Sequence, residues 1–160
     1  MIVFHGSYME VEQPLALAGR ANLDFGHGFY ITDVLKQAQD WAKDRARKRK
    51  AQPVLNVYEL DMEAIKRDYR YLGFPSYNRD WLHFVVGSRT GSEAWKQYDV
   101  IEGGVADDSV IDTVEGYMAG QMSEEYALNK LIKAEPNNQI CLLKQEIIDK
   151  YLTFKESINL

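Results

Sequence analysis

Residues 23–33 read LDFGHGFYITD. Two glycines flank one histidine, and an aromatic pair follows before the pattern turns apolar. Glycine adopts backbone conformations that other residues avoid, so the stretch predicts a turn followed by a short strand. The same arrangement would let the loop backbone and the Tyr30 ring hold a flat ligand. The composition, charge pattern and motifs of the whole chain help to decide between these two interpretations.

Composition favours one folded domain spanning residues 1–160. The chain is 46% hydrophobic and 27% charged, which is ordinary for a globular protein. A chain of this length can bury a core without disulfides. The sequence holds a single cysteine, Cys141, so no internal disulfide is expected. Residues 1–14 show no basic segment followed by an apolar run, and no stretch is long enough to span a bilayer. We therefore expect a cytoplasmic protein without membrane partners.

Charge is distributed unevenly along the chain. The formal net charge of −5 argues against a general nucleic-acid binder. Residues 43–50, KDRARKRK, nevertheless carry six basic side chains. Such a run is most often a solvated helix face. Docking of a phosphate-rich or acidic target is the functional alternative.

Hydrophobic periodicity predicts short strands alternating irregularly with helices. Strands are expected at 2–5, 29–32, 54–60, 98–106, 139–143 and 151–154. Helices are expected over about 34–50 after a Thr32 or Asp33 cap, around 81–86, from Asp107 or Asp108, from Ser123 to Pro136, and from about Lys144. This order indicates an α+β fold and not a regular βαβ alternation.

Several familiar motifs are excluded. The chain has no GxxxxGK[ST] and no GxGxxG sequence, so neither phosphate-binding turn is supported. Asp24-Phe25-Gly26 spells DFG, but the other kinase motifs are absent. The three histidines form no ligand pair, so no metal is expected. Cys141 lies inside an apolar strand pattern, which is typical of a core residue and not of a nucleophile.

Polar and aromatic side chains remain at the ends of three expected strands. His5-Gly6-Ser7 ends the first strand, Gly28-Phe29-Tyr30 opens the second, and Asn138-Gln139 opens a late one. A glycine lets a ligand approach the backbone, a tyrosine can stack and donate, and a neutral histidine can donate. A glutamine both donates and accepts but cannot act as a base.

These residues carry a resemblance to a known superfamily. The matching stretches are VFHGS (3–7), DFGHGFYIT (24–32) with WA (41–42), VLNVYELD (54–61), YDVIEGGVADDSV (98–110) and NNQICLL (137–143). Together and in this order they resemble the ADP-ribosyltransferase superfamily in its His-Tyr-Glu branch, the branch of diphtheria toxin and the poly(ADP-ribose) polymerases. A small bacterial family of unknown function within that clan is more similar still.

The resemblance implies a split β-sheet fold that grips NAD in a cleft, without a metal. By analogy His5 would hydrogen-bond the adenosine ribose, and the Gly6 backbone would hold the nicotinamide amide. Tyr30 would stack on the nicotinamide ring, with Ser7, Gly28 and Phe29 as neighbouring cofactor-binding residues. His27 lies at a variable position of the family and receives no catalytic role.

One departure from the family pattern affects the chemistry. The branch usually has a glutamate where this chain has Gln139. A carboxylate at that position stabilises the positive charge that grows on the ribose when nicotinamide leaves. Its loss is expected to cost roughly 2–4 kcal/mol of transition-state stabilisation, about 10²–10³ in rate. Glu135 is a nearby alternative carboxylate, although Pro136 separates it from the strand.

Three functional hypotheses follow. The first is a mono-ADP-ribosyltransferase or NAD glycohydrolase, the toxin of a toxin–antitoxin pair, with catalytic residues His5, Tyr30 and Gln139 and an antitoxin protein as partner. The second is a degenerate module that binds NAD or ADP-ribose as a sensor or scaffold. The third is transfer of ADP-ribose to nucleic acid gripped by residues 43–50. The acceptor itself is not readable from the sequence.

Overall fold

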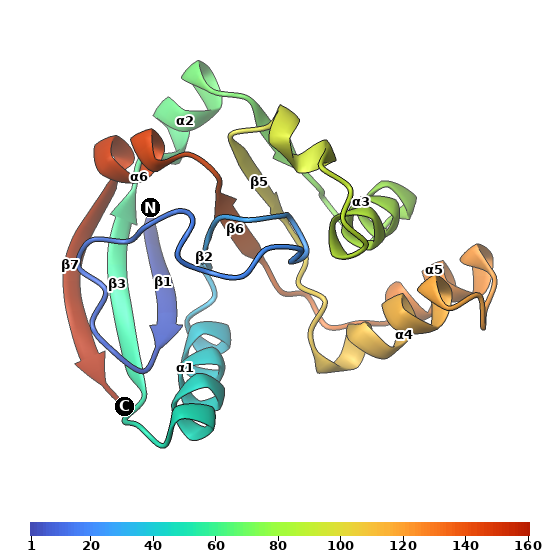
Figure 1. The fold of residues 1–160 in the computed structure, drawn as a ribbon, viewed down its shortest axis with the longest axis horizontal. Helices are drawn as coiled ribbons and strands as arrows, with labels where there is room; N and C mark the ends of the chain where they lie inside the picture. The colour runs from blue at the N-terminus through green and yellow to red at the C-terminus, as the bar shows by residue number, and fades with distance from the viewer.

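The chain folds into two β-sheets surrounded by helices, as a computed structural model that describes residues 1–160 apart from the side chain of Ser109 (Figure 1). The strands are β1 (Ile2–Ser7), β2 (Phe29–Ile31), β3 (Val54–Leu60), β4 (Tyr71–Gly73), β5 (Val100–Gly103), β6 (Gln139–Leu142) and β7 (Leu152–Asn159). The helices are α1 (Leu35–Arg49), α2 (Met62–Asp68), α3 (Arg79–Arg89), α4 (Asp108–Met118), α5 (Glu124–Leu131) and α6 (Gln145–Tyr151), with a 3₁₀ turn η1 (Ala94–Gln97). The expected α+β class is therefore confirmed.

The two sheets differ in size and composition. The first has the order β1-β3-β7 and the second the order β2-β6-β5-β4. Every neighbouring pair is antiparallel except β4 and β5. In Figure 1 the two sheets stand side by side, with α4 and α5 at the right of the view, on the side of the second sheet.

A single two-residue bridge joins the sheets. Phe4 of β1 donates its N–H to the Thr32 carbonyl at 2.7 Å, and Thr32 donates back to the Phe4 carbonyl at 3.0 Å. This bridge places β1 beside β2, so the strand order across the molecule is continuous from β7 to β4 at this point. The junction positions the candidate site.

Three clusters of buried side chains separate the layers. The first cluster lies between the sheets and is closed by α2 and α6: Val3, Phe29, Ile31, Tyr58, Leu60, Ile65, Ile140, Leu142 and Ile147 are among its members. The second covers the other face of the β2 sheet with α3, α4 and α5: Phe25, Tyr30, Trp81, Leu82, Val85, Val110, Val114 and Cys141 belong to it. The third packs Ala38 of α1 on Leu55 and Val57 of β3. Both faces of the β2 sheet are thus buried, which explains the continuous apolar runs of β5 and β6.

Helix α1 ends as the sequence predicts but begins differently. The basic run closes the helix, and Lys50 follows in the left-handed conformation with φ 52°. The expected capping by Thr32 or Asp33 is wrong, because Val34 occupies the N-cap position without a side-chain cap. The Thr32 hydroxyl instead donates to the Asn138 carbonyl and ties β2 to β6. Ala38, Ala42 and Ala46 form the buried face of the helix, and Leu35, although apolar, is 45% exposed.

Other boundaries needed correction. Helix α2 and strand β4 were not expected; α2 begins at an Asp61 cap whose carboxylate accepts the Ala64 N–H. Helix α5 starts at the predicted Ser123 cap but ends at Leu131, ahead of Pro136. Strand β7 extends to Asn159, well beyond the expected 151–154, because it pairs with the whole of β3. None of the described helices combines the length and apolar character needed to cross a bilayer.

Candidate functional site

The three predicted catalytic residues lie on three adjacent strands at the junction of the sheets. His5 belongs to β1, Tyr30 to β2 and Gln139 to β6, and β2 lies between the other two strands. Tyr30 pairs with Cys141 across the β2–β6 ladder, so Gln139, two residues before Cys141, shares its face of the sheet. His5 follows Phe4, the bridge partner of Thr32, so its ring lies on the opposite face of the sheet, against Phe29.

His5 is buried and neutral. Its side chain is 9% exposed, and its ring packs against Phe29 with centroids 4.6 Å apart. Nδ1 donates to the Tyr30 carbonyl at 2.7 Å, which leaves Nε2 to accept from Arg45 Nη1 at 3.1 Å. Burial, and then the charge of Arg45, lower the pKa of His5 to about 3. The imidazole can therefore hold hydrogen bonds near neutral pH without carrying charge.

Gly6 is a glycine because helix α1 leaves no room for a side chain. A Cβ there would lie 2.1 Å from the Ala38 carbonyl oxygen and 2.5 Å from the Ala42 nitrogen. Since alternate residues of a strand direct their polar backbone groups to the same edge, Gly6 turns its N–H and C=O toward the edge that Phe4 uses. The Gly6 carbonyl accepts from Arg45 Nη1 at 2.7 Å. The backbone of Gly6 thus faces the junction, and its Cα faces the helix.

Tyr30 anchors the loop that precedes it. Its hydroxyl donates to the Gly26 carbonyl at 2.7 Å and accepts the Phe25 N–H at 3.0 Å. The side chain is 9% exposed, and burial raises the pKa of its phenol well above the usual value. The glycines of the opening stretch therefore shape a turn that closes around this ring. Stacking of the ring on a ligand stays a prediction, and it requires the turn at residues 25–26 to open.

The remaining predicted binding residues are mostly enclosed. A Cβ on Gly28 would lie 2.6 Å from Cys141 Sγ, so this glycine permits close packing of β2 on β6. Phe29 is buried between the sheets, and Ser7 is buried at the end of β1. His27 is held outside the junction, with Nε2 3.1 Å from the Leu17 carbonyl and 2.7 Å from that of Gly19.

Gln139 joins a buried ion pair that the sequence did not reveal. Its Nε2 donates to Asp24 Oδ2 at 3.0 Å and lies 3.3 Å from the Gly104 carbonyl. Asp24 also accepts from Ala106 N at 3.0 Å and from Arg89, whose Nη2 lies 2.6 Å from Oδ1. Gln139 and Asp24 are only 4% and 6% exposed. A carboxylate is therefore present beside Gln139, supplied by the DFG sequence and not by Glu135, which is exposed.

Sequence patterns could have drawn attention to Asp24 but not to its partners. An acidic residue directly before Phe25-Gly26 in a glycine-rich turn is a candidate for a buried role. Arg89 ends an amphipathic helix and Arg45 lies within a basic run, so each looks like an ordinary surface cation. Only the tertiary fold brings Arg89 to Asp24 and Arg45 to His5.

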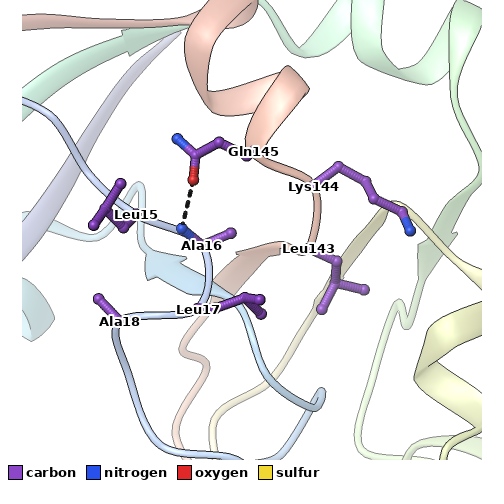
Figure 2. A pocket seen from close by; sticks show the side chains of 7 residues that line it. All are labelled: Leu15, Ala16, Leu17, Ala18, Leu143, Lys144 and Gln145. Carbon is purple, nitrogen blue, oxygen red and sulfur yellow. Dashed lines mark hydrogen bonds between the residues drawn. The ribbon is translucent and has the colours of Figure 1, made fainter.

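A separate pocket lies outside the junction. Figure 2 shows this pocket of about 430 Å³, between the 15–18 segment and the start of α6. Gln145 closes one side by accepting the Ala16 N–H at 2.9 Å and donating to the Pro14 carbonyl at 3.0 Å. The lining is mainly aliphatic: Leu15, Ala16, Leu17, Ala18 and Leu143 contribute to it, with Lys144 and Gln145. None of the predicted catalytic residues lines it.

Cys141 is a core residue, as the sequence predicts. Cys141 is fully buried, and burial raises the pKa of its thiol, which confirms the core assignment. Across the residues whose side chains are described, no group of three or more His, Cys, Asp or Glu is placed to hold a metal ion.

A family model described as "Protein of unknown function (DUF3990)" matches residues 1–154. Since the match covers nearly the whole chain, the protein belongs to this family. Neither the curated proteins nor the solved structures contain a match. Membership of a family of unknown function agrees with the expectation from sequence, and the resemblance to ADP-ribosyltransferases stays a prediction.

Proposed function

We propose that this protein cleaves NAD, as a mono-ADP-ribosyltransferase or an NAD glycohydrolase with the split-sheet fold of that superfamily. The observation that carries the proposal is the position of His5, Tyr30 and Gln139 on the neighbouring strands β1, β2 and β6, where His5 bonds the Tyr30 carbonyl. The backbone of Gly6 faces the junction of the two sheets. These are the residues to which the resemblance assigns the ribose, the nicotinamide and the reacting carbon.

The proposed roles use groups whose ionisation suits them. Neutral His5 would bond the adenosine ribose, and the N–H and C=O of Gly6 would pair with the nicotinamide amide. The C1′–N bond of NAD then breaks, and its electron pair leaves with nicotinamide. Water or a nucleophile of the acceptor attacks C1′ and releases a proton. Both outcomes balance without a redox partner or a metal.

The surroundings of Gln139 indicate how it could act at the position where the superfamily that the sequence resembles usually has a glutamate. Gln139 would hold a ribose hydroxyl through its amide, while Asp24, 3.0 Å from Nε2, supplies the nearby carboxylate. Arg89 neutralises much of that charge, since it pairs with Asp24 at 2.6 Å. The electrostatic stabilisation of the ribose is then weaker than a free glutamate would provide. We expect single transfer or slow hydrolysis, and not polymer synthesis.

Nicotinamide release from NAD by the purified protein tests the proposal. Release by the wild type that His5→Ala abolishes would support an NAD-cleaving enzyme, and labelling of a lysate with ADP-ribose would then identify the acceptor. Arg47→Gln is a suitable control because Arg47 lies on the exposed face of α1 and pairs only with Asp44. A wild type that neither binds NAD nor labels any target would refute the proposal.

A second candidate, a module that binds NAD or ADP-ribose without turnover, is favoured by the Asp24–Arg89 pair. Both charges are already satisfied within the protein, so no free carboxylate is available beside Gln139. Calorimetry that shows NAD binding, together with no nicotinamide release over hours, would select this function. We likewise propose that the acceptor is a protein or a nucleic acid and that a protein antitoxin is a partner.

A further inference from the structure

Arg45 is a partly buried cation with no carboxylate partner. Its Nη1 donates to the Gly6 carbonyl at 2.7 Å and to His5 Nε2 at 3.1 Å. Among the side chains that the structure describes, no Asp or Glu oxygen lies within 4.0 Å of its guanidinium. Burying a charge against neutral acceptors alone is unfavourable, so such an arginine commonly awaits an anion.

The other basic residues of the 43–50 run are engaged differently. Asp44 pairs with Arg47 at 2.7 Å and with Lys48 at 2.5 Å, on the exposed face of α1. The Arg49 guanidinium lies over the Tyr8 ring, 5.3 Å from its centroid. Arg45 instead turns inward to β1. The run is therefore a solvated helix face with one member directed into the candidate site.

Two features indicate that the ligand is a phosphate group. Only Nη1 of Arg45 is engaged by the described residues, so Nε and Nη2 remain as a fork suited to two oxygens of one phosphate. Arg20 is a second cation in this region: after burial, its charge is the largest influence lowering the pKa of Arg45. Arg20 likewise forms no ion pair with a described side chain. Two cations that repel each other are favourable once an anion lies between them.

A purely structural role for Arg45 explains its bond to His5 but not its remaining N–H donors. Arg45 Nη1 fixes the tautomer of His5 by donating to Nε2, and this would position His5. That role needs one N–H of the five that arginine carries, and it places no described carboxylate within 4.0 Å of the guanidinium. A ligand carrying negative charge accounts for the charge, the open fork and the second arginine together.

We propose that Arg45 binds the diphosphate of the dinucleotide. This inference rests on the proposed function, because it names the part of NAD that the site recognises by charge. On binding, Nε and Nη2 of Arg45 take two phosphate oxygens, and Nη1 leaves the Gly6 carbonyl and His5 Nε2. Those two acceptors are the atoms that the nicotinamide amide and the adenosine ribose would then use. Arg45 thus exchanges bonds within the protein for bonds to the ligand.

Calorimetry with NAD, ADP and inorganic pyrophosphate tests the proposal on the wild type, Arg45→Gln, Arg45→Lys and the control Arg47→Gln. Charge-assisted bonds to a diphosphate are worth about 10–100-fold in affinity. We expect Arg45→Gln to weaken all three ligands by about that factor and Arg45→Lys by less. Arg47→Gln should bind within about twofold of the wild type. Binding of ADP by the wild type should also weaken with salt more steeply than binding by Arg45→Gln.

The three ligands separate the possible outcomes. Arg45→Gln that weakens NAD but not pyrophosphate would reduce Arg45 to a positioning residue for His5 and overturn the inference. Unchanged binding of all three would overturn it as well, whereas the proposed function would stand. A wild type that binds ADP and pyrophosphate through Arg45 but not NAD would support the anion site and refute the function. Should Arg45→Gln fail to fold, Arg45→Lys must still bind ADP more weakly than Arg47→Gln, or the inference fails.

Discussion

His5 gives the folded protein a specific dependence on pH. Its pKa is lowered to about 3 in the folded state, because burial and Arg45 disfavour the imidazolium. In the unfolded chain a histidine titrates near 6.5. Below that value the unfolded state takes up a proton that the folded state does not. Stability therefore falls as the pH drops from about 6.5 toward 3, and it is fully present above about 6.5.

We predict that replacing His5 with glutamine removes most of this acid sensitivity. One unit of separation between folded and unfolded pKa corresponds to about 1.4 kcal/mol, so His5 accounts for up to about 2 kcal/mol between pH 7 and pH 5. Urea unfolding of the wild type and His5→Gln at both values measures the difference. His83→Gln is the control, since this histidine is half-exposed on α3. Equal losses of stability in the wild type and His5→Gln would show that His5 is not protected from protonation.

The Asp24–Gln139 contact favours an amide over a carboxylate at position 139. A carboxylate at 139 would face the Asp24 carboxylate at about the 3.0 Å that now separates Nε2 from Oδ2. The amide avoids that repulsion and donates instead. Exchanging the carboxylate and the amide between positions 24 and 139 should therefore change the stability by an amount that the two single substitutions do not predict.

We predict non-additive effects of Asp24→Asn and Gln139→Glu on the free energy of unfolding. Gln139→Glu should destabilise by about 1–3 kcal/mol through repulsion, and Asp24→Asn should do likewise by leaving Arg89 unpaired. The double variant retains one carboxylate, one amide and Arg89, so about 0.5–3 kcal/mol of coupling should return. Urea unfolding of all four proteins measures this cycle.

The same four proteins test the proposed chemistry. Asp24→Asn should lower nicotinamide release by about 10–100-fold, and the double variant should recover at least part of it. Asp44→Asn serves as the control, because its carboxylate pairs with Arg47 and Lys48 on the surface. Simple additivity in stability, together with an inactive double variant, would show that Asp24 and Gln139 are not a functional pair.

At the scale of elements, close contact between β1 and α1 holds the first part of the site in place. Gly6 lies against the helix backbone, and Arg45 reaches from the same helix to the strand edge. We predict that Gly6→Ala destabilises the fold by about 1–3 kcal/mol or more, because the new methyl group would meet backbone atoms that cannot rotate away. Thermal or urea unfolding checks this value.

Gly19→Ala is the matched control for Gly6→Ala. A Cβ at Gly19 would find its nearest neighbour, the Gly28 carbonyl oxygen, at an ordinary 3.8 Å. Its free energy of unfolding should therefore stay within about 0.5 kcal/mol of the wild type. If Gly6→Ala lowered the free energy of unfolding as little as Gly19→Ala, α1 would have to move away from β1 easily. The contacts of Arg45 with Gly6 and His5 would then not be rigid.

Elements with strong local signals were predictable, and their contacts were not. The apolar runs of β3 and β6 and the Ser123 cap of α5 were placed correctly, because each depends on neighbouring residues. Helix α2 and β4 were missed, since the short helix rests on the Asp61 cap and the strand on pairing with β5. Asp24 and Arg89 are 65 positions apart, so local patterns contain no information about their pairing.

At the scale of the whole molecule, the candidate site lies at the junction of two sheets that share one core cluster. The first sheet packs on α1 and the second on α3, α4 and α5, and the shared core closes the space between them. Among the described residues, backbone–backbone hydrogen bonding between β1 and the β2 segment consists of the Phe4–Thr32 bridge, and the His5 side chain adds a bond to the Tyr30 carbonyl. A ligand that bonds to both β1 and β6 would add hydrogen bonds between the two sheets beside this bridge.

We predict that NAD slows amide hydrogen exchange on both sides of this junction. Protection should increase at 4–7 and 29–32, while the β3–β7 ladder, already paired along its length, should change little. At NAD concentrations near 100 times the dissociation constant, ligand binding adds about 2.7 kcal/mol to the free energy of unfolding. ADP should protect the segment around Arg45 but leave 29–32 near its unliganded exchange rate, because it lacks the nicotinamide. Protection confined to 15–18 and 143–145 would instead place the nucleotide in the aliphatic pocket of Figure 2 and would contradict a site built on His5, Tyr30 and Gln139.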